Sequence, residues 1–259
     1  MSMPVQSKPK VKTCARTFRI IELVDELNGA TLNELSQQTD MAKSTVHNHL
    51  TTLEQLRLVV KEGGCYYPGL KFLRYGMNAK RRNGLSSIAK PELENIAEET
   101  GEVAWLVVEE HGKGIYLEKA QGPKAVQTFG QTGKEVYLHA SSVGKAILAH
   151  LPDSRIEEII EHHGLPAMTE QTVTDQGELF DELDTIRERG IAFNRGETVP
   201  GLKGVACPII YNGEVWGAVA IGAPAERLKG EKFSEVVPSI LSGATNAIEL
   251  TLRHEDSTA

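Results

Sequence analysis

The sequence predicts an α+β protein of two domains, in which three short helices and a hairpin precede a longer alternation of strands and helices. Its 259 residues allow two hydrophobic cores at roughly 100–200 residues per domain. The chain is 40% hydrophobic and 24% charged, as an ordinary globular protein is. The segment 1–83 contains thirteen basic and seven acidic residues, whereas the segment 84–259 contains fifteen basic and twenty-eight acidic ones. This division of charge indicates that the first part binds a polyanion, although the net charge of −7 alone argues against one.

The first domain follows a tail, residues 1–12, that is expected to be flexible. The apolar spacing of Thr13–Leu27 predicts an amphipathic helix, and the Asn-Gly pair that follows supplies the turn that ends it. A second helix is expected to begin at Thr31, because the Thr31 hydroxyl and Glu34 form the pattern of a capping box.

A third helix, Lys43–Leu56, has an apolar stripe on one side and short hydroxyl, amide and imidazole side chains on the other. Leu58–Glu62 and Cys65–Tyr67 flank a Gly-Gly pair and predict a β-hairpin. The order of these elements is that of a winged helix-turn-helix. A helical bundle with a solvated face is the alternative, but such faces normally carry Glu and Lys. The residues predicted to contact double-stranded DNA are Lys43, Ser44, Thr45, His47, Asn48, Thr51 and Thr52 on the helix and Lys61 on the hairpin.

The segment Leu70–Gly84 predicts a further helix that combines apolar residues with five basic ones. A single helix between two domains is best explained as a linker, and its apolar side chains are expected to pack against a second copy of the chain.

The second domain is expected to be an antiparallel sheet with helices against it, because several of its strands are joined by hairpins. One hairpin is predicted by Asn212-Gly213. The expected strands are Val103–Val108, Gly114–Ala120, Val126–Phe129, Glu135–His139, Ile191–Asn194, Val205–Tyr211 and Glu214–Gly222. The expected helices are Ser86–Thr100, Ser142–Leu151, Ser154–His163, Glu178–Gly190 and Glu231–Leu252.

A cytoplasmic protein is expected. The longest uncharged stretch, Val236–Ile248, contains Pro and Gly and is shorter than the roughly 18 apolar residues of a membrane span, and the N-terminus lacks the apolar core of a signal peptide. Cys14, Cys65 and Cys207 are far apart and match no metal-ligand spacing. We therefore expect reduced cysteines, no metal and no cofactor.

An enzyme in the second domain is the competing interpretation. Ala140–Gly144 lacks only the first glycine of a G-x-S-x-G nucleophile motif, with Ser142 as the serine. Ser142 is better explained as a helix cap, and His139 and His162-His163 are expected to be surface or capping residues. No catalytic residue is therefore assigned.

Several motifs resemble those of the IclR family of transcriptional regulators. Thr31–Leu35, Lys43–Leu53 and Tyr67–Leu73 resemble its DNA-binding half. The second half of the chain matches at His139–Ala146, Arg187–Ile191, Pro200–Leu202 and Ala206–Ile209. The resemblance implies a winged helix-turn-helix at 13–69, a linker helix at 70–84 and a GAF-like α/β effector domain at 85–259.

The resemblance also implies a homodimer or dimer of dimers that binds a palindromic operator under the control of a small organic acid or aromatic metabolite. Carried over by motif, the effector-binding residues are Ser142, Val143, Asn194, Gly204, Ala220 and Gly222. Backbone N–H groups at Ser142–Gly144 are expected to bind an anion. Two alternatives stay open: the glycines only permit close packing, or the second domain is a dimerising scaffold without a ligand. Asn48 stands where many members have Arg, which favours an A·T pair over a G·C pair.

Overall fold

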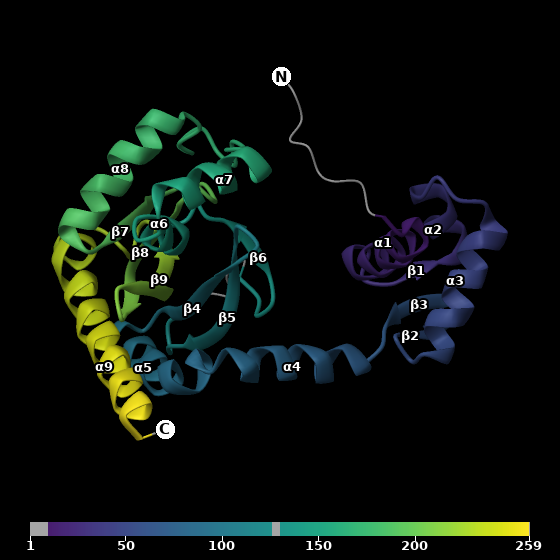
Figure 1. The fold of residues 1–259 in the computed structure, drawn as a ribbon, viewed down its shortest axis with the longest axis horizontal. Coiled ribbons are helices and arrows are strands. Elements are labelled where there is room, and N and C mark those ends of the chain that lie inside the picture. The colour runs from purple at the N-terminus through teal and green to yellow at the C-terminus, as the bar shows by residue number, and fades with distance from the viewer. Residues whose placement is uncertain (1–9, 126–129, 259) are drawn as a thin grey trace. The chain divides into compact units, whose positions relative to one another are not determined.

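The computed structural model describes residues 10–125 and 130–258 (Figure 1). The chain divides into two compact units, one that ends at Arg82 and one that begins at Asn83. The predicted strand Val126–Phe129 and most of the N-terminal tail lie outside the described residues.

The N-terminal unit contains the predicted three helices and hairpin. Its elements are α1 (Lys12–Glu26), β1 (Ala30–Thr31), α2 (Leu32–Gln38), α3 (Lys43–Gln55), β2 (Val59–Glu62), β3 (Cys65–Pro68) and α4 (Lys71–Asn83). The sequence did not predict β1, a two-residue strand that pairs with β3 and makes the hairpin a three-stranded sheet in the order β1-β3-β2. One core joins α1, α2, α3 and the sheet, and the stripe of α3 that enters it is Val46, Leu50 and Leu53.

Local signals position the helices of this unit. The Thr31 hydroxyl accepts a hydrogen bond from the Glu34 N–H, while the Glu34 carboxylate accepts one from the Thr31 N–H at 2.8 Å, so the predicted capping box is present. The turn after α1 uses positive φ angles at Asn28 (51°) and Gly29 (103°). Gly29 is required there for a second reason, because a Cβ would lie 2.2 Å from the Tyr67 ring.

The C-terminal unit is built on one six-stranded antiparallel sheet in the order β6-β5-β4-β9-β8-β7. Its strands are β4 (Val103–Glu110), β5 (Lys113–Gln121), β6 (Glu135–Tyr137), β7 (Ala192–Arg195), β8 (Leu202–Tyr211) and β9 (Glu214–Pro224). Its helices are α5 (Leu85–Thr100), α6 (Ser142–Leu148), α7 (Asp153–His163), α8 (Gln176–Arg189) and α9 (Val237–Thr258), with a π-helical turn at Lys232–Val236 before α9.

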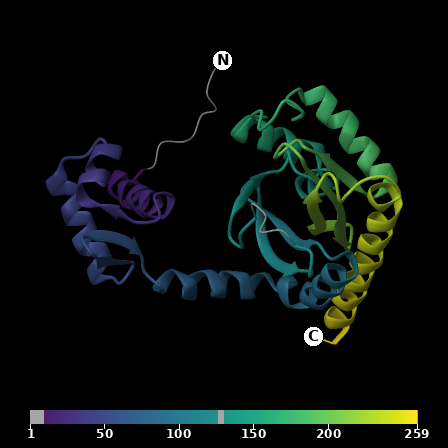
Figure 2. The same cartoon turned by 180° about the vertical axis from the view of Figure 1, so that it is seen from behind.

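Helices cover both faces of this sheet, as predicted for an antiparallel α+β sandwich. On one face α5 and α9 lie side by side, as Figures 1 and 2 show, and pack on a core that includes Leu106, Val205 and Ile221. On the other face α6, α7 and α8 pack on a second core that includes Trp105 and Val107. Neighbouring residues of β4 therefore point into different cores, as the alternation of side chains along a strand requires.

Two expectations about polar residues were wrong. Ser141, not Ser142, caps α6, and its hydroxyl accepts a hydrogen bond from the Gly144 N–H at 3.1 Å. His139 is not a surface or capping residue but is buried, with its Nε2 atom 3.1 Å from the Pro166 carbonyl oxygen. In both cases the side chain lies where the chain turns from β6 into α6, and sequence spacing does not reveal which residue of a polar run faces inward.

Among the helices of residues 10–125 and 130–258, none is both long enough and apolar enough to cross a membrane.

Candidate functional site

The outer face of α3 carries the side chains predicted to contact DNA. Thr45 is half-buried and the other residues of the predicted set are exposed; these are Lys43, Ser44, His47, Asn48, Thr51 and Thr52 on α3 and Lys61 on β2. No side chain caps the N-terminus of α3, so within the described chain the first N–H groups of this helix have no side-chain acceptor. The structure thus places a polar surface on one exposed helix whose N-terminus has no side-chain cap.

The hydroxyls of that surface have defined roles. Thr51 donates to the His47 carbonyl and Thr52 to the Asn48 carbonyl, each at 2.9 Å. Their oxygens are therefore left to accept hydrogen bonds, whereas the exposed Asn48 amide offers both a donor and an acceptor.

Neighbouring helices hold α3 in place. The Thr17 hydroxyl of α1 lies 2.9 Å from Nδ1 of the half-buried His49. At the other end of α3, the Lys71 ammonium donates to the Leu56 carbonyl at 3.0 Å. Lys71 therefore stabilises the C-terminus of α3.

A cavity of about 350 Å³ lies in the C-terminal unit, between the sheet and the start of α6. All six residues carried over by motif as effector-binding line it. They are Ser142 and Val143 on α6, Asn194 on β7, Gly204 on β8, and Ala220 and Gly222 on β9. The structure thus brings together segments that are up to 80 residues apart in the chain.

Small residues keep this cavity open. Asn194, Gly204 and Gly222 pair with one another across β7, β8 and β9 and form a row across the sheet. A Cβ at Gly204 would lie 2.7 Å from the Ser142 hydroxyl, whereas a Cβ at Gly222 would meet no atom within 4 Å. Gly204 therefore makes room for Ser142, and Gly222 makes room inside the cavity.

The polar side chains of the cavity wall divide into bonded and unbonded groups. The Asn194 amide donates to the Ala140 carbonyl at 2.7 Å, and its oxygen accepts from the N–H groups of Gly196 and Glu197. The Thr198 hydroxyl also donates to Ala140, at 2.6 Å. In contrast, Ser142 is 94% buried, since its exposed fraction is 6%, and its hydroxyl has no hydrogen-bond partner in the part of the chain that the structure describes. Asn194 thus supports the wall, while Ser142 is available to a ligand.

Sequence reasoning missed three aromatic residues of the cavity, Trp105, Tyr116 and Tyr137. Trp105 on β4 and Tyr116 on β5 both line it, with ring centroids 4.7 Å apart in an edge-to-face arrangement. Burial raises the pKa of the Tyr116 hydroxyl. Both the Trp105 indole N–H and the Tyr116 hydroxyl lack a partner among the described residues. The alternation of side chains in Val103–Val108 shows that Trp105 and Leu106 face opposite sides, but only the sheet order shows which side holds the cavity.

The geometry around Ser142 argues against both an anion site at the start of α6 and a serine nucleophile. The Gly144 N–H is already bonded to Ser141, so it is not available to an anion, and α6 is only seven residues long. No histidine stands among the described residues that line the cavity, so an imidazole base for a serine nucleophile is missing from that wall.

Comparison with known proteins gives the same division of the chain. Residues 13–63 match the family model of the IclR helix-turn-helix domain. Residues 77–248 match the model described as the bacterial transcriptional regulator IclR C-terminal domain.

Individual relatives are similar over almost their whole length. The HTH-type transcriptional regulator BhcR of Paracoccus denitrificans is 30% identical over 90% of this chain and 85% of its own. The crystal structure of the Thermotoga maritima IclR is 28% identical, with a TM-score of 0.76 over 93% of this chain and 98% of that one. An IclR homologue from Microbacterium hydrocarbonoxydans, solved in complex with 4-hydroxybenzoate, is 26% identical, with a TM-score of 0.79 over 93% of this chain and 99% of that one.

Proposed function

Because this chain belongs to the IclR family of transcriptional regulators, with a DNA-binding helix-turn-helix and a C-terminal effector-domain fold, we propose that a small organic molecule in the C-terminal cavity controls its binding to an operator. The observation that carries the proposal is the cavity itself. Three aromatic rings line it, together with a buried Ser142 hydroxyl that has no partner among the described residues. A regulator, not an enzyme, is also what the names of the relatives describe, among them the transcriptional repressor IclR of Escherichia coli.

The cavity favours a flat organic acid or aromatic metabolite. Its volume of about 350 Å³ lies near the lower end of small-molecule sites, which span roughly 300–1,000 Å³. Trp105 and Tyr116 offer an apolar wall with an N–H and an O–H that can bond a carboxylate or a hydroxyl. The structural relative that holds 4-hydroxybenzoate makes this compound a reasonable first probe. The proposed effector-binding set is Ser142, Val143, Asn194, Gly204, Ala220 and Gly222, with Trp105 and Tyr116 added.

We propose that α3 enters the major groove and that the exposed set on α3, with Lys61 on the hairpin, contacts double-stranded DNA. A palindromic operator requires two such helices, and α4 supplies a surface for pairing. Leu70, Leu73 and Met77 are spaced three and four residues apart on one side of α4 or just before it, and they are 87%, 63% and 48% exposed. A second copy that covers this stripe would give a homodimer, or a dimer of dimers, that works in the cytoplasm.

The proposed domain boundaries follow the sequence motifs. They are 13–69 for the winged helix-turn-helix, 70–84 for the linker helix and 85–259 for the effector domain. The change from one compact unit to the other at Arg82 and Asn83 supports a boundary near the end of α4.

A thermal-shift screen tests the effector proposal. The panel is 4-hydroxybenzoate, pyruvate, glyoxylate and a set of sugar acids and aromatic acids. A compound at 100 times its Kd stabilises the folded chain by roughly 2.7 kcal/mol. The variant Gly222→Val places a side chain in the cavity and should abolish the shift, whereas Gly243→Ala on α9, where a Cβ also meets no atom within 4 Å, should preserve it.

The active compound should also change the Kd of the wild-type protein for its operator. A shift that survives Gly222→Val would place the ligand elsewhere. If no compound in the panel shifts the transition, the scaffold without a ligand becomes the better explanation.

A further inference from the structure

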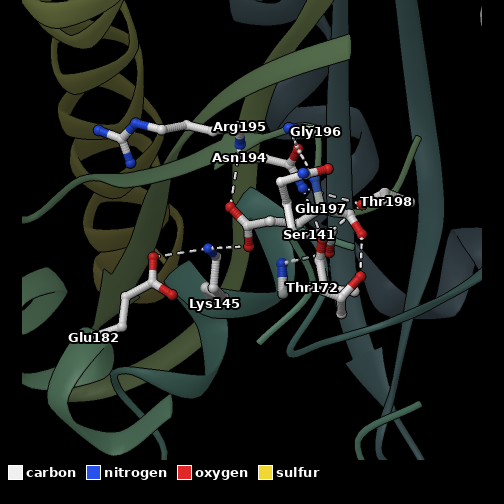
Figure 3. A network of polar contacts seen from close by, with 12 residues as sticks. Ser141, Lys145, Thr172, Glu182, Asn194, Arg195, Gly196, Glu197 and Thr198 are labelled. Atoms are coloured by element: carbon white, nitrogen blue, oxygen red, sulfur yellow. Dashed lines mark hydrogen bonds and ion pairs between the residues drawn. The ribbon is translucent and has the colours of Figure 1, made fainter. Parts of the chain in front are cut away.

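A buried lysine lies directly behind the cavity wall. Lys145 is in the middle of α6, one turn after Ser141, and is fully buried. Figure 3 shows its ammonium group between two carboxylates, Glu182 of α8 and Glu197 of the loop between β7 and β8. The Nζ–Oε distances are 2.7 Å to Glu182 and 2.5 Å to Glu197. A charged group is rarely buried in this way unless its partners hold it in a fixed position.

Glu197 joins the segments that line the cavity. Its side chain reaches Lys145 with one oxygen and accepts the Arg195 N–H at 3.1 Å with the other. Its carbonyl oxygen accepts the Thr172 hydroxyl at 2.6 Å, and that hydroxyl in turn accepts the N–H of Met168. Its own N–H donates to Asn194.

These bonds connect three parts of one wall. Met168 lines the cavity from the loop before α8, Asn194 on β7 and Thr198 in the loop after it form a second part, and Ser142 lines it from α6. Met168 is connected to Glu197 through two hydrogen bonds, by way of the Thr172 hydroxyl, and Asn194 is connected to it by one. Ser142 is on the same helix as Lys145, which forms the ion pair with Glu197. Because Glu197 is 94% buried, with an exposed fraction of 6%, water cannot easily replace any of these partners.

The two carboxylates are not equivalent. The Glu182 side chain is 22% exposed and its residue does not line the cavity, whereas the Glu197 side chain is 8% exposed and its loop forms part of the wall. Removal of the Glu182 charge leaves Lys145 paired with Glu197. Removal of the Glu197 charge leaves Lys145 paired with Glu182 but breaks the ion pair that joins the loop to α6.

We propose that Lys145 and Glu197 are positioning residues that hold residues 194–199 against α6 and thereby set the shape of the effector cavity. This inference rests on the proposed function of the cavity, but it concerns the geometry of the wall before any ligand binds. In this proposal the buried ion pair contacts no ligand itself. It controls where Ser142, Asn194 and Thr198 lie.

Hydrogen exchange measured by mass spectrometry on the full chain tests the proposal without DNA or effector. Glu197→Gln keeps the size of the side chain and removes its charge. We expect peptides that cover 194–201 to exchange roughly tenfold faster, with β4 and α9 unchanged. The matched control Glu182→Gln should leave residues 194–201 as in the wild-type protein.

The two tryptophans allow a second readout of the cavity. Trp105 lines it and is 5% exposed, whereas Trp216 is 41% exposed, so Trp216→Phe leaves Trp105 as the single tryptophan reporter of the chain. In that background, Glu197→Gln should make Trp105 more accessible to acrylamide quenching. A general loss of stability without opening of the cavity would not change the quenching of the folded protein.

The double variant Lys145→Met/Glu197→Gln is a second way to break the pair if the single variant fails to fold. It removes both charges and leaves the Glu182 carboxylate, whose side chain is 22% exposed, without Lys145. It should show the same faster exchange at 194–201. Unchanged exchange and quenching in the folded variants, or equal acceleration of every peptide, would overturn the proposal. Neither result would affect the thermal-shift test of the effector site.

Discussion

Two glycines of the C-terminal unit have opposite surroundings, and this difference defines the space at the start of α6. A Cβ at Gly144 would lie 2.1 Å from the Leu138 carbonyl oxygen, so α6 and the end of β6 approach as closely as backbones can. At Gly222 the corresponding space is empty. The close approach at one glycine and the empty space at the other together leave a cavity beside a tightly packed helix.

The first prediction compares these positions. Gly144→Ala forces the backbone of α6 away from Leu138 and should lower the free energy of unfolding by about 1–3 kcal/mol. Gly222→Ala adds a methyl group to open space and should change it by no more than about 0.5 kcal/mol. Urea denaturation of the two variants measures both values. Equal destabilisation would show that the Cβ positions do not govern packing here.

A second prediction concerns pH. Burial lowers the pKa of His139, and the Lys113 and Lys145 ammonium groups lower it further, while the hydrogen bond to the Pro166 carbonyl raises it. The folded chain therefore binds this proton less readily than the unfolded chain, whose histidine has a pKa near 6.5. The stabilisation is complete above that value and is lost as the pH falls towards the lower pKa of the folded state.

The free energy of unfolding of the C-terminal unit should thus decrease below about pH 6.5, by at most roughly 1.4 kcal/mol per pH unit for one proton. His139→Gln should flatten this slope, and His162→Gln, at an exposed position, should not. An identical pH profile in wild type and His139→Gln would rule out His139 as the source.

At the scale of single residues, the sequence predicted only part of the cavity wall. The family resemblance pointed to six residues that line one cavity in the structure, and two of them, Gly204 and Gly222, pair across β8 and β9. It could not distinguish Ser141 from Ser142 as the cap, since both are serines beside the same turn. Nor could it find Trp105, whose role depends on which face of the sheet α6 covers.

Among the elements, α2 shows most directly how a local signal fixes a helix. Its capping box is complete, and the Glu34 carboxylate has a lowered pKa because the Thr31 backbone and side chain both donate to it. Almost every helix and hairpin was predicted from spacing of this kind. The exceptions are β1, which is too short to leave a pattern, and the π-helical turn before α9.

The third prediction follows from the cap. Thr31→Ala removes one acceptor and should destabilise α2 by about 1 kcal/mol, measurable as faster hydrogen exchange of the amides in residues 32–36. Ser36→Ala is the control, because the Ser36 hydroxyl only donates to the Asn33 carbonyl within the same helix. If both variants exchange alike, the capping box does not stabilise α2.

The fourth prediction concerns α3, whose exposed face is proposed to contact DNA. Asn48 has an amide that can pair with adenine through two hydrogen bonds. Asn48→Ala should weaken operator binding by about 1–3 kcal/mol and relax base preference at one position in each half-site. Competition binding with operators changed at single positions measures this preference. A uniform loss over all sequences would instead make Asn48 a contact to the DNA backbone.

At the scale of the whole molecule, basic and acidic residues are concentrated in different parts of the chain. Thirteen basic and seven acidic residues precede residue 84, whereas acidic residues outnumber basic ones by thirteen in the remainder. The excess of positive charge thus belongs to the part that contains the helix-turn-helix, and the net charge of −7 describes neither half. The length of the chain predicted two domains and the division of charge predicted which of them binds DNA, whereas the cavity could be found only from the order of strands in the sheet.

The most direct test of a DNA-binding regulator is a fluorescence-anisotropy titration of the full chain on a fragment from upstream of its own operon, repeated from 50 to 200 mM salt. Sub-micromolar binding is expected at the lowest salt, with a loss of roughly 10³ to 10⁵ in affinity over this range if six to ten phosphates are contacted. Lys61→Ala should reduce the salt slope by about 1. Binding that does not change with salt, or no binding to the fragment at any salt, would contradict the account.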